Sequence, residues 1–230
     1  MSKRRLFVLG STVVWVAVLA LLVKTSVDRV SAPPWGNPMG ESGALAMQTG
    51  NRVGQQFTAP FPGLYRIDVM LNPAPTTATQ LVTMHLKTDP AAVTDLWASS
   101  FRSGDLQAGL PYRAEFAPLR DSKDRTYYFY LESPDSGPGE TVTARYSPDA
   151  ILDNAGAYVN DRPVAGNLQF TTHYTLRTRD KVDLLLSRMA EGRPYWWGTK
   201  GFYAGLAVVY LLLLAAFLWQ AGRAVLKREP

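Results

Sequence analysis

The sequence predicts an all-β domain of sandwich type between two membrane-spanning helices. Three patterns indicate this arrangement: an uncharged apolar run at 201–221, a second one at 6–23, and alternating apolar and polar residues over short segments of 45–176. A helix of about 20 apolar residues crosses the roughly 30 Å of hydrocarbon in a bilayer. Alternation with period two is typical of half-buried strands. Each part of the chain is justified in turn below.

The apolar run at 201–221 has the flanks of a spanning helix. A helix buried in a soluble domain is rarely apolar on every side over such a length. Aromatic side chains gather where a spanning helix meets the membrane interfaces, and cations lie beyond them. The expected interface anchors are Tyr195, Trp196, Trp197 and Trp219, and residues 222–230 form a basic cytoplasmic tail.

The apolar run at 6–23 follows a basic N-terminus, residues 1–5, and allows two interpretations. A secretory signal peptide has an apolar core of about 7–15 residues and a small-residue cleavage site. Here the run is longer, and Pro33 directly follows the nearest small-residue site. The pattern therefore favours an uncleaved transmembrane helix, whereas cleavage would leave a type I protein with one span.

The basic flanks also predict the topology. Cytoplasmic segments carry an excess of Lys and Arg, so both termini are expected in the cytoplasm and residues 24–200 outside it. The chain contains no cysteine. That composition suits a bacterial extracytoplasmic domain better than a small eukaryotic ectodomain. We therefore expect a two-pass protein of a bacterial cytoplasmic membrane.

Residues 24–44 are expected to be a linker because they are rich in Pro and Gly. The linker is short, so the domain should lie close to the membrane. Trp35 is expected to touch either lipid headgroups or the domain.

Residues 45–176 are predicted to form a jelly-roll-like sandwich of about eight antiparallel strands. Tyr127, Phe129 and Leu131, for example, alternate with more polar neighbours, and clusters of Asn, Asp, Gly and Pro separate the segments. The strands are expected near 53–59, 64–71, 79–87, 95–101, 111–117, 126–133, 140–146 and 167–175.

Residues 177–200 are predicted to hold one short amphipathic helix and the aromatic belt of the second span. Val182, Leu185, Leu186 and Met189 have helical spacing. Thr178 is the expected N-cap, and Gly192 with Pro194 is expected to end the helix. The helix either lies in the membrane interface or packs against the sandwich; the pattern does not separate the two.

Motifs for catalysis, cofactors or metals are not found in the sequence. Without cysteine, disulfides, thiolate metal sites and thiol catalysis are excluded. No nucleophile elbow, phosphate loop, dinucleotide fingerprint or zinc-protease motif is present. His85 and His173 stand alone and are expected on the surface. The Lys and Arg residues flank the spans or mix with acids, so we expect no nucleic-acid binding.

Acidic loop residues are the remaining candidates for a metal. Asp121 with Asp124, or Asp149 with Asp153 and Asn154, could supply the oxygen ligands that Ca²⁺ prefers. The same residue types are ordinary turn formers, and this second interpretation is favoured. We expect no catalytic residue, no cofactor and no metal.

Aromatic residues in the domain are candidates for a contact surface. If Tyr127, Phe129 and Leu131 face inward, their neighbours on the same strand project from the other side of the sheet. That side is either covered or a contact surface, whereas Trp97 is expected in the core. The candidate contact residues are Tyr128, Tyr130, Tyr158 and Trp35.

Small and aromatic residues in the spans suggest helix packing. Small side chains allow close helix approach in lipid, as at Gly10 and Ser11 in the first run. In the second run the candidate packing face is Tyr203, Gly205 and Tyr210.

Several segments resemble a recurrent extracytoplasmic module. They are Val53-Gly-Gln-Gln-Phe57, Gly63-Leu-Tyr-Arg-Ile-Asp-Val69, Ala117-Pro-Leu-Arg-Asp-Ser122 and Tyr127-Tyr-Phe-Tyr-Leu-Glu-Ser133. These runs resemble a jelly-roll β-sandwich, similar to a carbohydrate-binding module, that is appended to bacterial multi-spanning proteins, including lipid-linked-sugar glycosyltransferases. The resemblance covers about 50–175 and implies a binding or packing module. This chain departs from the pattern by lacking a multi-spanning catalytic part.

Together these patterns predict a non-enzymatic accessory subunit of a larger integral membrane complex, braced by two helices and an outer sandwich. The alternative is a membrane-tethered glycan-binding module for envelope polysaccharide or glycosyl transfer. An exposed aromatic platform with nearby Asn and Asp would favour the alternative, and a sandwich with internal aromatics would not. A membrane-anchored hydrolase would need clustered acids in a cleft.

Overall fold

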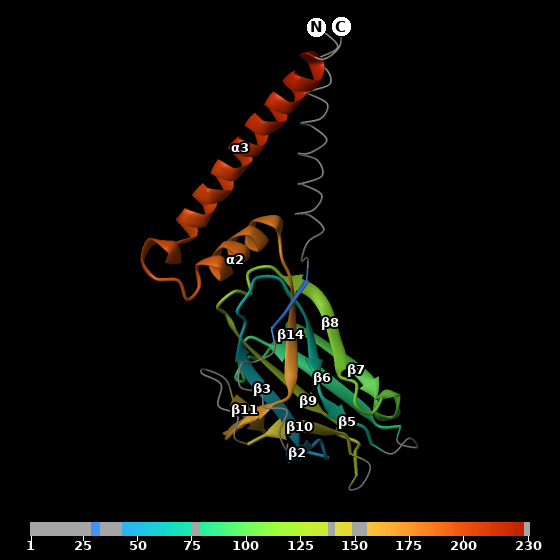
Figure 1. Cartoon of the computed structure of the whole chain (residues 1–230). Helices are drawn as coiled ribbons and strands as arrows, with labels where there is room; N and C mark the ends of the chain where they lie inside the picture. Colours follow the sequence, from blue (N-terminus) through green and yellow to red (C-terminus); the bar gives the residue numbers. More distant parts are fainter. Residues whose placement is uncertain (1–28, 33–42, 75–78, 138–140, 149–155, 228–230) are drawn as a thin grey trace. The chain divides into compact units, whose positions relative to one another are not determined.

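The computed structural model describes residues 29–32, 43–74, 79–137, 141–148 and 156–227. They fall into two compact units: a β unit, Arg29–Thr175, and a helical unit that includes residues 176–227. Figure 1 shows both. The predicted first span at 6–23, with Gly10 and Ser11, lies outside the described residues. So do Trp35 and the acidic candidates Asp149, Asp153 and Asn154.

The β unit confirms the all-β class. Its described residues form fourteen strands, paired antiparallel in three sheets. The strands are β1 Arg29–Ala32, β2 Gly43–Ala46, β3 Arg52–Thr58, β4 Leu64–Val69, β5 Leu71–Asn72, β6 Leu81–Lys87, β7 Trp97–Arg102, β8 Tyr112–Leu119, β9 Thr126–Glu132, β10 Thr143–Ser147, β11 Gly156–Val159, β12 Arg162–Val164, β13 Asn167–Leu168 and β14 Phe170–Thr175.

Two of the sheets pack on each other as a sandwich. The large sheet has the order β12-β11-β3-β9-β6-β7, and the β14 sheet has the order β1-β14-β4-β8. A small third sheet is built around β10, which pairs with β2, β5 and β13. Phe170 of β14 lies 5.5 Å from Phe57 and 5.4 Å from Phe129, measured between ring centroids. These rings join the inner faces of the two main sheets, because Phe57 and Phe129 belong to the large sheet.

All eight predicted strand regions contain a strand, but four further strands were not predicted. They are β1, β2, β11 and β12, and each has three or four residues. Alternation over so few residues gives too weak a pattern to identify a strand from sequence. The proposed linker 24–44 accordingly contains β1, whose Val30 is buried and pairs with Tyr174. The β unit therefore begins at Arg29.

The helical unit contains α2, Thr178–Ala190, the short 3₁₀ helix η2, Tyr195–Gly198, and α3, Lys200–Lys227. Within the described part of the chain, α3 is the one helix long and apolar enough to cross a membrane. It continues six residues beyond the predicted span end at 221. Arg177, not Thr178, is the N-cap of α2, because its N–H bonds Asp180 Oδ2 at 3.3 Å. Gly192, with a φ of +70°, follows the helix end as predicted.

Candidate functional site

The outer face of the large sheet carries a layer of aromatic and charged side chains. Residues that alternate with the core positions of β3, β6 and β9 project to this face. The register places Tyr130 opposite both Gly54 and His85. Strands distant in sequence thus bring these side chains together. We call this set the outer layer: Arg52, Gln56, His85, Lys87, Asp95, Tyr128, Tyr130, Glu132, Tyr158 and Asp161.

Tyr128 occupies the space that the missing side chain of Gly54 leaves. A Cβ atom built on Gly54 would lie 2.4 Å from the Tyr128 hydroxyl oxygen. Tyr128 is only 1% exposed, and its hydroxyl donates to Asp161 Oδ1 at 3.2 Å. Burial raises the pKa of Tyr128, and the Asp161 charge raises it further. Beside it, the Tyr158 hydroxyl donates to Gln56 Oε1 at 2.7 Å.

Tyr130 contacts an imidazole and lies near two cations. The His85 ring stacks on it with a centroid separation of 4.4 Å and an interplanar angle of 2°. Arg52 and Lys87 lie 5.5 Å and 5.1 Å from its ring centroid, within cation–π distance. Burial, followed by the charges of Glu132 and Asp95, raises the pKa of Tyr130 to about 12. Only 6% of Tyr130 is exposed.

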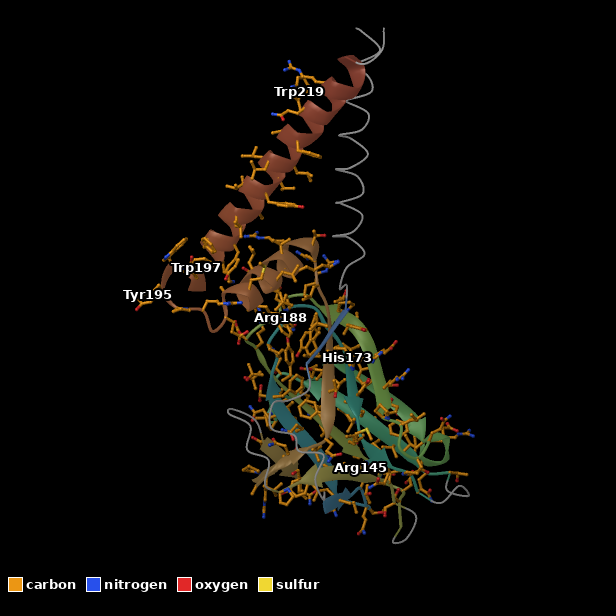
Figure 2. All side chains as sticks on the ribbon, in the orientation of Figure 1. Arg145, His173, Arg188, Tyr195, Trp197 and Trp219 are labelled. Carbon is orange, nitrogen blue, oxygen red and sulfur yellow. The ribbon has the colours of Figure 1, made fainter. Side chains whose placement is uncertain are left out.

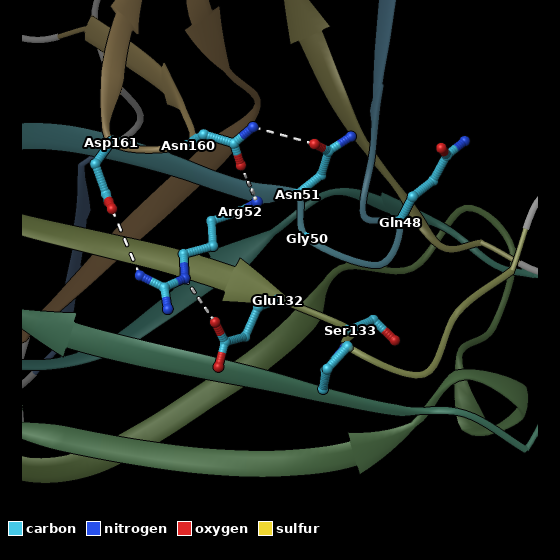
Figure 3. A pocket seen from close by; sticks show the side chains of 9 residues that line it. Gln48, Gly50, Asn51, Arg52, Glu132, Ser133, Asn160 and Asp161 are labelled. Atoms are coloured by element: carbon cyan, nitrogen blue, oxygen red, sulfur yellow. Dashed lines mark hydrogen bonds and ion pairs between the residues drawn. The ribbon is translucent and has the colours of Figure 1, made fainter.

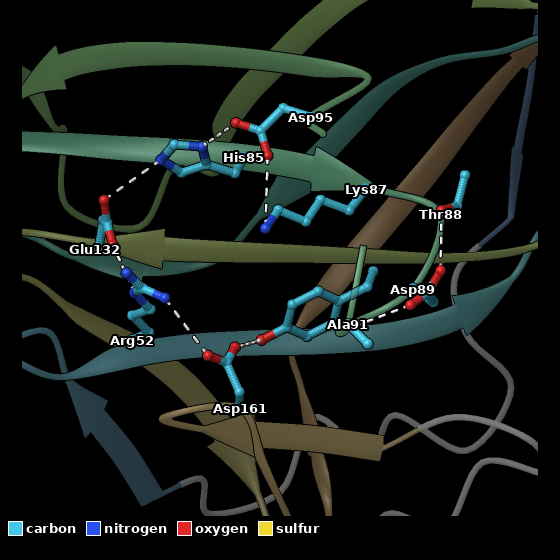
Figure 4. A network of polar contacts seen from close by, with 10 residues as sticks. Arg52, His85, Lys87, Thr88, Asp89, Ala91, Asp95, Glu132 and Asp161 are labelled. Atoms are coloured by element: carbon cyan, nitrogen blue, oxygen red, sulfur yellow. Dashed lines mark hydrogen bonds and ion pairs between the residues drawn. The ribbon is translucent and has the colours of Figure 1, made fainter. Parts of the chain in front are cut away.

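Carboxylates pair with the cations of the outer layer (Figure 4). Arg52 Nε lies 2.8 Å from Glu132 Oε2, and Arg52 Nη1 lies 3.5 Å from Asp161 Oδ2. His85 Nδ1 lies 2.7 Å from Asp95 Oδ2, and Lys87 Nζ lies 3.9 Å from Asp95 Oδ1. These contacts join three strands, β3, β6 and β9, to two connecting segments, the β11–β12 turn and the segment before β7. The layer therefore satisfies its own charges instead of presenting a single-sign field to a partner.

A polar pocket of about 400 Å³ opens at one end of the outer layer (Figure 3). Asn160 and Asp161 form the tight β11–β12 turn there, with φ values of +52° and +59°. The Asn160 side chain accepts from the Arg52 backbone N–H at 2.9 Å and donates to Asn51 Oδ1 at 3.1 Å. The lining residues are Gln48, Gly50, Asn51, Arg52, Glu132, Ser133, Pro134, Asn160 and Asp161. This set offers carboxamides, carboxylates and a guanidinium, groups suited to a polyhydroxylated ligand.

A second polar cluster lies on the outer side of the β14 sheet. Asp68 makes two contacts with Arg66, at 2.9 Å from Nε to Oδ1 and 3.0 Å from Nη2 to Oδ2. His173 Nε2 lies 3.0 Å from Asp68 Oδ2 and 3.1 Å from Arg66 Nη2. Burial lowers the pKa of His173; Asp68 opposes this, while Arg66 and Arg113 lower it further. Both histidines predicted on the surface thus have only 15% of their side chains exposed.

The predicted contact residues Tyr128, Tyr130 and Tyr158 do lie together, but the first two are buried. Their strand is therefore covered on this side, one of the two alternatives that the sequence left open. Arg52, Glu132 and Asp161 were missed. Each is a common surface residue type, and no sequence signal shows that β3 and β11 lie beside each other.

The acidic candidates Asp121 and Asp124 lie in the turn before β9. Asp124 has a φ of +59°, and its N–H donates to the Ala59 carbonyl at 2.8 Å. In the described parts of the chain, no cluster of three or more His, Asp or Glu side chains is placed to hold a metal ion.

The predicted interface anchors are exposed aromatic residues of the helical unit (Figure 2). Tyr195 is 91% exposed, and Trp196 is 60% exposed. Arg223 lies 5.1 Å from the Trp219 ring centroid near the other end of α3. The predicted packing face needs a geometric correction. At about 100° per residue, Tyr203 and Tyr210 share one side of α3, whereas Gly205 points to nearly the opposite side.

Comparisons with known proteins give no family. No family model matches the sequence, and no curated protein matches it. Among solved structures, one match is the tomato aspermy virus structure, at 13% identity and a TM-score of 0.28, covering 71% of this chain and 94% of that one. Another is the infectious bursal disease virus VP2 subviral particle, at 10% identity and a TM-score of 0.14, covering 87% of this chain and 52% of that one. Neither likeness is close enough to support an argument about fold or function.

Proposed function

We propose that this protein is a non-enzymatic accessory subunit of a larger integral membrane complex. The observation that carries the proposal is α3, whose apolar side chains are exposed along the segment Lys200–Phe217. Exposed apolar surface of this extent is stable only in lipid or against another apolar helix. In this proposal α3 crosses a bilayer, and the side of α3 that carries Tyr203 and Tyr210 packs against a helix of the partner.

The surface of the β unit supports an accessory role over catalysis. Its two polar clusters pair their charges internally, and Tyr128 and Tyr130 lie beneath that pairing. Among the described residues of the β unit, the exposed large apolar side chains are aliphatic: Leu81, Val93, Leu96 and Leu110. The layer is thus an internally paired surface, suited to bracing a neighbour.

We further propose that residues 6–23 form a second span, with both termini in the cytoplasm of a bacterium and the β unit outside. The basic flanks of the two runs support this topology. The β unit would be a jelly-roll-like module of the kind appended to bacterial membrane glycosyltransferases. The partner would then be a membrane protein that the two helices hold beside the module.

The test is extraction from native membranes in mild detergent, followed by native electrophoresis and mass spectrometry of the band. The proposal expects stoichiometric migration with a larger integral complex. Tyr210→Ala should reduce that association at least tenfold if the tyrosine side of α3 contacts the partner. Leu212→Ala is the matched control, because Tyr210 and Leu212 are both 65% exposed but lie on opposite sides of the helix.

Migration of the wild-type chain alone would contradict the accessory role. Equal losses for Tyr210→Ala and Leu212→Ala would contradict the specific contact side. The amount of each variant in the same membranes is measured as well. It shows whether a weaker complex band reflects weaker association or a lower amount of the protein.

Glycan binding is the second candidate function, and the polar pocket is the observation that favours it. Its carboxamides and carboxylates suit sugar hydroxyls, although the described residues offer no exposed aromatic platform in the β unit. Titration of the full chain with envelope oligosaccharides, followed by NMR, tests this function. Gln48→Ala, in the pocket, should abolish the shifts, and Gln107→Ala, an exposed glutamine elsewhere, should preserve them. No shift with the wild-type chain would reject this candidate.

A further inference from the structure

One side of α2 exposes an apolar stripe to its surroundings. Val182, Leu185 and Met189 are 43%, 52% and 49% exposed. At about 100° per residue, they lie within about 60° of one another around the helix. An amphipathic helix of a water-soluble domain normally turns such a stripe toward a core. The stripe of α2 therefore requires an apolar neighbour.

The ionic residues around the stripe indicate which neighbour it is. Arg179 lies about 60° to one side of Val182, and Arg188 lies about 60° to the other side of Leu185. Both arginines are exposed. Over residues 177–200 the chain carries six basic and three acidic residues. Long cationic side chains beside an apolar stripe are typical of helices that lie in a membrane interface rich in anionic headgroups.

The contacts between α2 and the start of α3 also indicate that α2 lies at a membrane interface. Asp183 Oδ1 of α2 lies 2.7 Å from Lys200 Nζ, at the first residue of α3. Between the two helices, η2 presents Tyr195, Trp196 and Trp197, all exposed. Trp196 and Trp197 lie 4.7 Å and 5.0 Å from the Phe202 ring centroid at the start of α3. The aromatic segment that anchors α3 is therefore held beside α2 in one compact unit.

We propose that α2 is a second membrane attachment, lying in the outer interface of the same bilayer that α3 crosses. Its stripe inserts at the boundary between headgroups and acyl chains, and Arg179 and Arg188 bind anionic headgroups. This inference rests on α3 being a span, as proposed above. It goes beyond that function by assigning a lipid-binding surface and a lipid class.

The test uses spin labels on the full-length protein in bilayers with and without anionic lipid. Because the chain contains no cysteine, one introduced cysteine gives one label. The variants are Leu185→Cys and Met189→Cys on the stripe, Glu191→Cys on the opposite side, and Leu212→Cys in α3. Collisions with oxygen report apolar surroundings, and collisions with a water-soluble nickel complex report aqueous surroundings.

The expected result is that oxygen collisions exceed nickel collisions at 185 and 189, and that nickel collisions dominate at 191. Adding Arg179→Gln or Arg188→Gln to Leu185→Cys should lower the ratio of docked to free label about fivefold each in anionic bilayers, since a cation near such a surface contributes about 1 kcal/mol. The same changes should have little effect in neutral bilayers.

Three results would overturn the inference. Aqueous accessibility at 185 equal to that at 191 would place the stripe in water. A label at 185 that neither reagent reaches would place the stripe against protein. Aqueous accessibility of the label at 212 would contradict the proposal that α3 spans the membrane. This label is measured in a separate variant, so its result does not depend on the labels on α2.

Discussion

The two units of this protein treat the same residue types in opposite ways. In the β unit, Tyr128 and Tyr130 are almost completely buried even though they lie on the outer side of a sheet. In the helical unit, Tyr195 and Trp196 are 91% and 60% exposed. An aromatic ring excluded from water in one unit and displayed in the other indicates two different surroundings. The β unit covers the outer rings with its own side chains, whereas the helical unit leaves its aromatic rings exposed.

The largest expected effect comes from removing one aromatic residue from each unit. Phe129→Ala should lower the free energy of unfolding of the β unit by about 3–5 kcal/mol, because it leaves a cavity between the main sheets. Trp196→Ala should change that free energy by less than about 0.5 kcal/mol, because its ring is exposed. Denaturant unfolding of the full chain in detergent, followed by a β-unit signal, measures both. Similar losses for the two variants would contradict the comparison.

A smaller effect should follow from filling the space under Tyr128. Gly54→Ala should destabilise the β unit by about 1–3 kcal/mol, because the new methyl group overlaps the Tyr128 ring. Gly156→Ala, on the neighbouring strand β11, is the matched control: a Cβ there meets no atom within 4 Å. Thermal unfolding compares the two variants. If Gly54→Ala is as stable as Gly156→Ala, the ring does not depend on that space.

The smallest effect is a dependence on pH at His173. Its pKa is lowered in the folded state, so below the unfolded value of about 6.5 the unfolded chain binds the extra proton first. Stability should therefore fall as pH drops from about 7 toward 5, and this part of the loss should be absent in His173→Gln. The difference between the two stability curves isolates the contribution of the histidine. A wild-type curve parallel to that of His173→Gln would contradict the lowered pKa.

The sequence contains enough information for the class of the β unit and for the inward sides of its main strands. The alternation around Phe129 predicts the inner face because burial of one face imposes period two. It cannot predict the outer layer, because the stacking of His85 on Tyr130 requires that β6 and β9 be neighbours. The role of Gly54 is hidden for the same reason. Its missing side chain matters only through a tyrosine more than seventy residues away.

The length of an element decides the other misses. Strand β1 was assigned to a linker because four residues beside a Pro-rich segment show no period. β1 forms a strand because it pairs with β14, not because of a pattern in its own sequence. The α3 packing face shows a different error, in which Gly205 was grouped with Tyr203 and Tyr210 by residue type although helix geometry separates them.

The pairing of β1 with β14 has a consequence for modularity. Arg29 and Thr175, the first and last residues of the β unit, are direct register partners. The entire unit is thus a loop whose entry and exit lie side by side, the arrangement that makes a domain easy to insert into a host chain or to remove from one. A few residues could bridge the ends if the unit were excised. The same fold could equally be transplanted into a surface loop of an unrelated protein as an interchangeable cassette.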